Sequence, residues 1–74
     1  QNLISEYKDS DKEDIFSYIN KTIEDAGCRM ENIKLTDEDS LCVLNAVLKA
    51  PDELDAALLV GELKKKKSVK RVSV

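Results

Sequence analysis

The acidic residues form two clusters whose side chains could bind a divalent cation. The first comprises Asp9, Asp11 and Asp14, and the second comprises Asp37, Glu38 and Asp39. Carboxylate oxygens are the ligands that Mg²⁺ and Ca²⁺ prefer. The first cluster is not an EF-hand loop, because Asp14 stands where that loop needs glycine and Asn20 where it needs glutamate. We expect mainly helix caps and solvated turns, with a weak cation site as the alternative.

A basic segment lies near the end of the chain. Residues 62–74 carry six Lys or Arg and one Glu. Lys64, Lys65, Lys66 and Lys67 are candidates for contact with an anionic membrane surface, and a solvated helix end is the alternative. Nucleic-acid binding is not expected, because the net charge of the chain is −3 and no aromatic residue accompanies the basic end.

The two cysteines, Cys28 and Cys42, are expected to be buried free thiols. A secreted domain of this size usually carries four or more cysteines, so the pair indicates a reducing compartment. The chain contains no histidine to complete a zinc site, and no catalytic motif is present. We therefore expect a protein that is not an enzyme and has no cofactor.

The length of 74 residues allows a single domain, residues 1–74, and the first residue is Gln1 rather than Met. We therefore expect a domain excised from a longer chain. The longest apolar stretch, Leu54–Gly61, contains Asp55 and is too short to span a bilayer. The content of 42% hydrophobic and 36% charged residues is typical of a soluble folded domain.

The elements that position these residues begin with a strand over 2–7 and a helix over 12–26. The helix has an apolar residue every three or four positions, and Gly27 follows it as a C-terminal cap. The apolar positions are Ile15, Ile19, Ile23 and Ala26. Ser10 and Glu13 have the spacing of a capping box.

Two strands follow, over 28–36 and 41–49, joined by a turn over 37–40. Ile33 and Leu35 share one phase of the first strand, whereas Met30 falls in the other, so regular pairing is expected to begin after Met30. If the turn occupies 37–40, Cys42 lies opposite about Leu35. The two cysteines are then roughly 23 Å apart, at about 3.3 Å per residue, which is too far for a disulfide.

The last two elements are a helix that opens at Ala50-Pro51 and continues to about Lys66, and a strand over 69–74. The apolar residues of this helix fall into two opposed groups, whereas a surface helix normally shows one. The groups are Leu54/Ala57/Leu58/Gly61 and Ala56/Leu59/Val60/Leu63. Part of one of these two groups is therefore expected to lie outside the core.

The order strand, helix, strand, strand, helix, strand predicts an α+β, ferredoxin-like βαββαβ sandwich. It has a four-stranded antiparallel sheet with two helices on one face. The strand over 41–49 is apolar in both phases, so one phase must face away from the helices. The expected partner is another protein or a second copy bound through this open face, with Leu41, Val43 and Val47 as interface candidates.

The apolar spacing resembles that of ACT-like regulatory domains over essentially the whole chain. It is most similar to the C-terminal cytoplasmic domain of the MgtC/SapB family of membrane proteins, which is associated with magnesium transport. The residues that carry the resemblance are Ala26-Gly27, Met30, Ile33, Leu35, Val43, Val47, Leu54, Leu58, Leu59, Leu63 and Val69–Val74. In that family a helix, a short spacer and a Val-x-x-Val strand end the domain, as they do from Leu63 onward here.

The resemblance implies a non-catalytic regulatory or protein-interaction domain on the cytoplasmic side of a protein in the cell membrane. The alternative is an ACT-type small-molecule sensor of a soluble metabolic enzyme. Amino-acid-binding ACT domains usually have a glycine between their first strand and first helix, and residues 9–14 contain none. This departure favours the MgtC-like interpretation.

Overall fold

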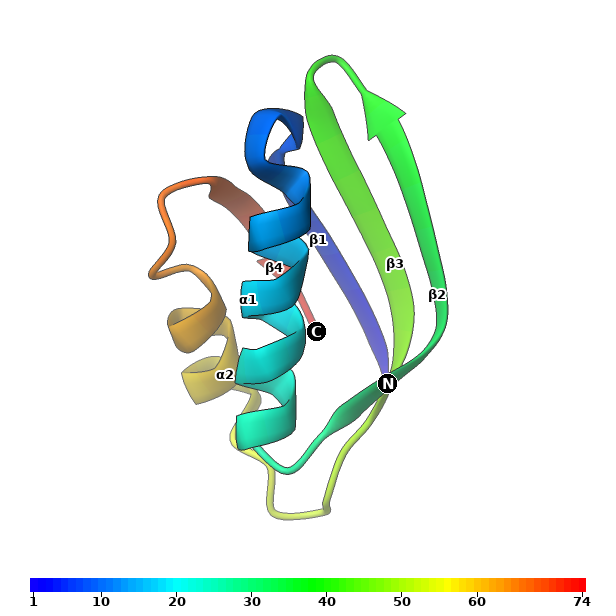
Figure 1. The fold of residues 1–74 in the computed structure, drawn as a ribbon. Coiled ribbons are helices and arrows are strands. Elements are labelled where there is room, and N and C mark those ends of the chain that lie inside the picture. The colour runs from blue at the N-terminus through cyan, green and yellow to red at the C-terminus, as the bar shows by residue number, and fades with distance from the viewer.

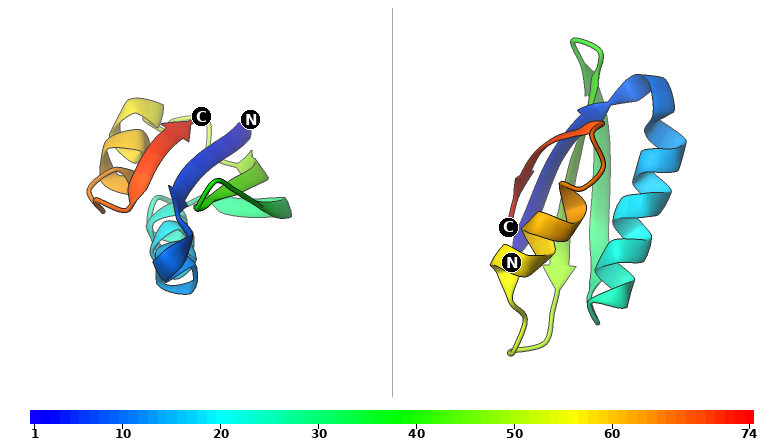
Figure 2. Two further views of the ribbon diagram at one scale, coloured as in Figure 1. Left: turned by 90° about the horizontal axis from the view of Figure 1, so that it is seen from above. Right: turned by 90° about the vertical axis from the view of Figure 1, so that its left-hand side faces the viewer.

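The computed structural model describes all residues from 1 to 74. The elements are β1 (Asn2–Lys8), the 3₁₀ turn η1 (Asp9–Asp11), α1 (Lys12–Asp25), β2 (Arg29–Glu38), β3 (Leu41–Lys49), α2 (Ala56–Leu63) and β4 (Val69–Ser73). The four strands form one antiparallel sheet in the order β2-β3-β1-β4, and both helices cover the same face (Figure 1). The predicted ferredoxin-like α+β fold is confirmed. The two chain ends lie side by side, as Figure 2 shows, because Ile4 pairs with Ser73.

Helix α1 packs on the sheet through the predicted isoleucines. Ile15, Ile19 and Ile23 are buried, whereas Ala26 is exposed and does not belong to the buried face. Gly27, with φ +79°, ends the helix: its amide donates to Glu24, and the next amide donates to Ile23. These two bonds form a Schellman motif, which needs the left-handed conformation that glycine adopts at low cost.

The predicted capping box is absent. The N-cap of α1 is Asp11, and its side chain makes no capping hydrogen bond. The η1 turn leads the chain into the helix instead. The amide of Asp9 donates to the carbonyl of Ser40 at 3.1 Å, so this turn is anchored to the tip of the β2–β3 hairpin.

Strand β3 separates the core from the open face. Cys42, Leu44, Ala46 and Leu48 are buried beneath the helices, and Leu41, Val43 and Val47 alternate with them on the helix-free face. The sequence pattern required this division and left open which set faces the helices. The structure assigns the even-numbered set to the core.

The register of the β2–β3 hairpin differs from the expected one by two residues. The turn is only Asp39-Ser40, so Cys42 pairs with Asp37 and Leu35 pairs with Leu44. Both turn residues have positive φ, 49° and 67°, as a two-residue type I′ turn requires. The sequence lacks the Asn-Gly or Asp-Gly pair that normally marks such a turn, so the local pattern does not indicate its position.

The phase change at Met30 has a different cause from the expected one. Pairing continues on both sides, with Met30 opposite Leu48 and Leu35 opposite Leu44, and a bulge between Glu31 and Lys34 inserts one residue. Asn32 has φ 54° within this bulge. The extra residue lets Met30 and Leu35 face the same side of the sheet although five positions separate them.

The second helix is shorter than expected at both ends. It begins after Asp55, whose side chain accepts a 3.1 Å hydrogen bond from the amide of Leu58, and it ends at Leu63 rather than Lys66. The segment opened by Pro51 forms a turn, in which the amide of Leu54 donates to the Pro51 carbonyl. Asp55 satisfies an amide that would otherwise lack a partner, so it is the better N-cap.

Candidate functional site: the groove between the helices

The two predicted acidic clusters lie at the same end of the sheet, as expected. The Nζ atom of Lys12 is 3.5 Å from Asp37, and η1 is hydrogen-bonded to Ser40. No three acidic, histidine or cysteine side chains come close enough to hold a metal ion. Asp9, Asp11, Asp14, Asp37, Glu38 and Asp39 therefore share an end of the molecule without forming a set of ligands.

The four predicted membrane-surface lysines, Lys64–Lys67, are all exposed in the turn after α2. Lys65 pairs with Glu62 at 3.1 Å, and the ammonium group of Lys66 lies 5.4 Å from the centre of the Tyr18 ring. Lys65 thus contacts α2 and Lys66 contacts α1. No helix of the structure has the length and apolar character needed to cross a membrane.

The open sheet face carries the predicted interface candidates as a half-buried row. Val43 lies between Thr36 of β2 and Glu6 of β1, and Glu6 pairs with Arg71 at 3.2 Å. Leu41 lies between Glu38 and Lys8, and Val47 between Glu31 and Asn2. Polar neighbours on both sides limit the exposure of the apolar row.

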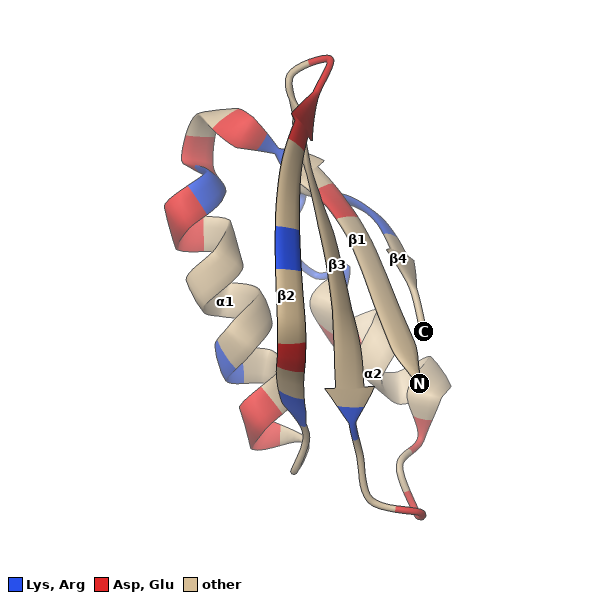
Figure 3. Cartoon of the chain, turned by 90° about the vertical axis from the view of Figure 1, so that its right-hand side faces the viewer, with Lys and Arg blue, Asp and Glu red and all other residues tan.

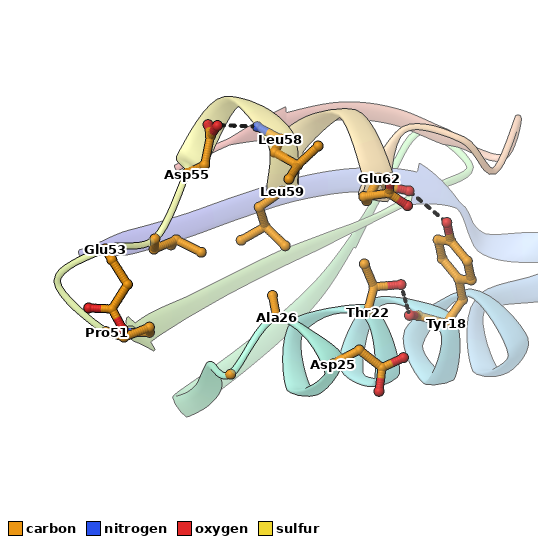
Figure 4. A pocket seen from close by; sticks show the side chains of 12 residues that line it. Tyr18, Thr22, Asp25, Ala26, Pro51, Glu53, Asp55, Leu58, Leu59 and Glu62 are labelled. Atoms are coloured by element: carbon orange, nitrogen blue, oxygen red, sulfur yellow. Dashed lines mark hydrogen bonds between the residues drawn. The ribbon is translucent and has the colours of Figure 1, made fainter.

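The largest cavity is a groove between α1 and α2 that the sequence did not predict as a site. It encloses about 870 Å³, and Figure 4 shows its lining residues. One wall is the C-terminal half of α1, and the other is the connection from β3 together with α2. The lining residues are Tyr18, Thr22, Asp25, Ala26, Gly27, Pro51, Glu53, Leu54, Asp55, Leu58, Leu59 and Glu62.

An exposed leucine, Leu58, lies on the α2 wall of this groove. Leu58 is 63% exposed, the largest exposed fraction among the large apolar side chains that reach the surface. Leu59, its neighbour, is buried in the core, and Leu54 is half-buried. Leu54 and Leu58 belong to the same apolar group of the predicted helix, Leu54/Ala57/Leu58/Gly61. That group was therefore a sequence feature from which the groove could have been found.

Hydrogen bonds fix one end of the groove. The Tyr18 hydroxyl donates to the carbonyl of Glu62 at 2.6 Å, and the Thr22 hydroxyl donates to the carbonyl of Tyr18 at 2.8 Å (Figure 4). The first bond joins α1 to α2, the second lies within α1, and both hydroxyls are thus engaged. The groups left free to meet a ligand are the apolar side chains and the carboxylates around them.

No protein-family model matches this chain, and no curated protein matches it significantly. Among solved structures it is similar to the solution structure of the C-terminal domain of the MgtC protein from Mycobacterium tuberculosis. The TM-score is 0.77 and the identity 19%, and the match covers 97% of this chain and 80% of that chain. The resemblance seen in the apolar spacing is confirmed at the level of the fold: this chain has the fold of the MgtC C-terminal domain.

Proposed function

We propose that the chain is a non-catalytic interaction domain of a membrane protein of the MgtC type, and that the helix groove binds a segment of another protein. The observation that carries this proposal is Leu58, which is 63% exposed in a groove floored by other apolar side chains. Exposed apolar side chains gathered in a cavity are typical of binding sites.

The polar groups around Leu58 support binding rather than a reaction. The hydroxyls of Tyr18 and Thr22 donate to main-chain carbonyls, and Asp55 caps α2. A nucleophile and its general base must lie within hydrogen-bond reach of each other. The groove lining contains no cysteine, serine, histidine or lysine that would serve as such a pair.

A cytoplasmic position next to the cell membrane is the second part of the proposal. It is supported by the fold shared with the MgtC C-terminal domain and by the exposed Lys64–Lys67 turn. Each lysine near an anionic membrane contributes about 1 kcal/mol of attraction. Binding of the domain to vesicles containing phosphatidylserine should weaken when the four lysines are changed to glutamine.

Selection from a displayed library of random peptides tests the function of the groove. We expect peptides that bind the wild-type domain and lose binding to the Leu58→Ser variant. Ile33→Ser is the matched control, since Ile33 is 44% exposed on β2 and does not line the groove. Failure to enrich any peptide, or equal binding to the wild-type and Leu58→Ser domains, would contradict the proposed function.

A second interaction surface is proposed on the open sheet face. Leu41, Val43 and Val47 form an apolar row that no helix covers. We expect the domain to self-associate in sedimentation experiments and the pair Val43→Lys and Val47→Lys to abolish association while the domain stays folded. A wild-type domain that remains monomeric at high concentration, with variants that unfold, would show that the row is a structural part of the sheet.

Small-molecule sensing of the ACT type is the competing function, because the groove volume of about 870 Å³ lies within the range of ligand pockets. The two functions differ in what stabilises the domain. We expect none of the twenty amino acids to raise its melting temperature. A rise that disappears in the Leu58→Ser variant would favour the sensor instead.

A further inference from the structure

The rim of the helix groove is negatively charged. Four of its 12 lining residues are acidic and none is basic, although the chain has 12 lysines and arginines. The acidic residues are Asp25, Glu53, Asp55 and Glu62. Figure 3 shows acidic residues at the end of α1 and in the connection to α2, the two segments that form the walls near Pro51. A concave surface lined by charges of one sign concentrates ions of the other.

The rim carboxylates are available to a partner. Asp25 pairs with Lys21 at 3.4 Å, and Glu62 pairs with Lys65 at 3.1 Å. The side chains of both ion pairs are at least 43% exposed. Exposed pairs of this kind contribute about 0–1 kcal/mol, so an incoming cation can replace either lysine. Glu53 takes part in no ion pair.

We propose that the groove accepts a cationic segment of another protein, in which an apolar side chain packs on Leu58 between lysine or arginine residues. This inference rests on the proposed function and adds the chemistry of the partner. An apolar anchor in a pocket gives most of the affinity of such contacts, and complementary charges around it give specificity.

Two other occupants fit the groove less well. An anionic membrane surface would be repelled by the carboxylates of the rim. A second copy of the chain would offer Lys64–Lys67, but these four residues are consecutive, and the next apolar residue, Val69, is buried. Leu63, on the other side of this run, is buried as well, so the run has no exposed apolar neighbour to serve as the anchor. The exposed side chains of Ile33 and Leu35 flank only one cation, Lys34.

The test uses three synthetic peptides titrated into the isotopically labelled domain by NMR. The first peptide alternates leucine and phenylalanine with lysine and arginine, the second has glutamate in place of the cations, and the third has serine in place of the apolar residues. We expect the first alone to bind, with shifts concentrated at Ala26, Leu54 and Leu58. Its affinity should fall as NaCl is added, because salt screens exposed charges.

Charge reversal of the rim provides the matched variants. Asp25→Lys with Glu53→Lys should weaken binding of the first peptide about tenfold, the effect of removing about 1.4 kcal/mol. The control is Asp11→Lys with Glu38→Lys, which changes the net charge equally at the opposite end of the molecule and should leave the affinity unchanged.

The outcomes separate the inference from the proposed function. The cationic inference is overturned if the acidic peptide binds as well, if the rim and control variants bind alike, or if the shifts map to the open sheet face. It is also overturned if peptides selected by display through Leu58 are neutral or acidic, although the proposed function then stands. If unlabelled domain added without any peptide produces the same shifts at Ala26, Leu54 and Leu58, the occupant is a second copy and the inference is overturned.

Discussion

The hydroxyl of Tyr18 donates a 2.6 Å hydrogen bond to the main-chain carbonyl of Glu62, and this bond joins the middle of α1 to the last turn of α2. The last carbonyls of a helix have no partner within the helix, so a side chain from outside satisfies one of them here. The bond fixes the spacing of the helices at one end of the groove. The groove therefore depends on a contact between residues 44 positions apart.

Tyr18→Phe should destabilise the domain, because it removes this hydrogen bond and keeps the ring. We expect the free energy of unfolding to fall by about 1 kcal/mol in urea titrations. Lys66→Gln is the control, since it removes only the cation over the ring and keeps the hydroxyl. Equal stability of Tyr18→Phe and the wild type would show that the bond does not hold the helices together.

Tyr7→Phe, in contrast, should not destabilise the domain at neutral pH. Tyr7 is fully buried, and its hydroxyl makes no hydrogen bond of good geometry, with only the weakly polar thiol of Cys42, its cross-strand neighbour, beside it. Burying an unpaired hydroxyl costs about 1–3 kcal/mol, so its removal should leave stability unchanged or raise it. A loss of more than about 1 kcal/mol in urea unfolding would reveal a partner for this group, such as a buried water.

The domain should also lose stability in alkaline solution. Burial raises the pKa of the Tyr7 hydroxyl well above its usual value of 10.0. The unfolded chain therefore releases this proton first, so the stabilisation is complete below about pH 10 and declines as the pH rises further. Urea unfolding at several alkaline pH values should show this decline, and the decline should be smaller in Tyr7→Phe. Identical pH dependences would contradict the assignment to Tyr7.

Both cysteines should react slowly in the folded protein and form no intramolecular disulfide. Cys28 and Cys42 are free and buried, and burial raises the pKa of the Cys28 thiol above its usual value. They lie at opposite ends of the β2–β3 pair, because Arg29 pairs with Lys49 and Cys42 with Asp37. Thiol titration should be slow in buffer and fast in urea. A Cys28–Cys42 disulfide formed without reductant would contradict this register.

The hairpin turn offers a stabilising substitution. Asp39 and Ser40 both have positive φ, a conformation that aspartate and asparagine tolerate and that strains serine relative to glycine. Asp39→Asn with Ser40→Gly should raise the free energy of unfolding by about 1 kcal/mol. Ser10→Gly, at a position without positive φ, should lower it instead. If the turn variant is less stable than the wild type, the turn is not of the type described.

Local patterns were sufficient to predict α1 and the order of the elements. The isoleucines of α1 recur at the helical period, and Gly27 stands where a left-handed residue ends the helix. The two phases of β3 likewise required one buried and one open face. Such features depend on residues a few positions apart, so the sequence shows them directly.

The register of β2, the start of α2 and the groove depend on contacts between distant residues. The bulge after Glu31 brings Met30 and Leu35 to the same face, and no local spacing predicts where an extra residue is inserted. Asp55 and Pro51 both suit a helix start, and the structure uses Asp55, whose side chain caps the helix. The sequence determined that the predicted second helix carries more apolar side chains than a single buried face can hold. Only tertiary packing decided that this surplus, Leu54 and Leu58, lines a groove against α1, because a groove exists only once two separate elements have been placed side by side.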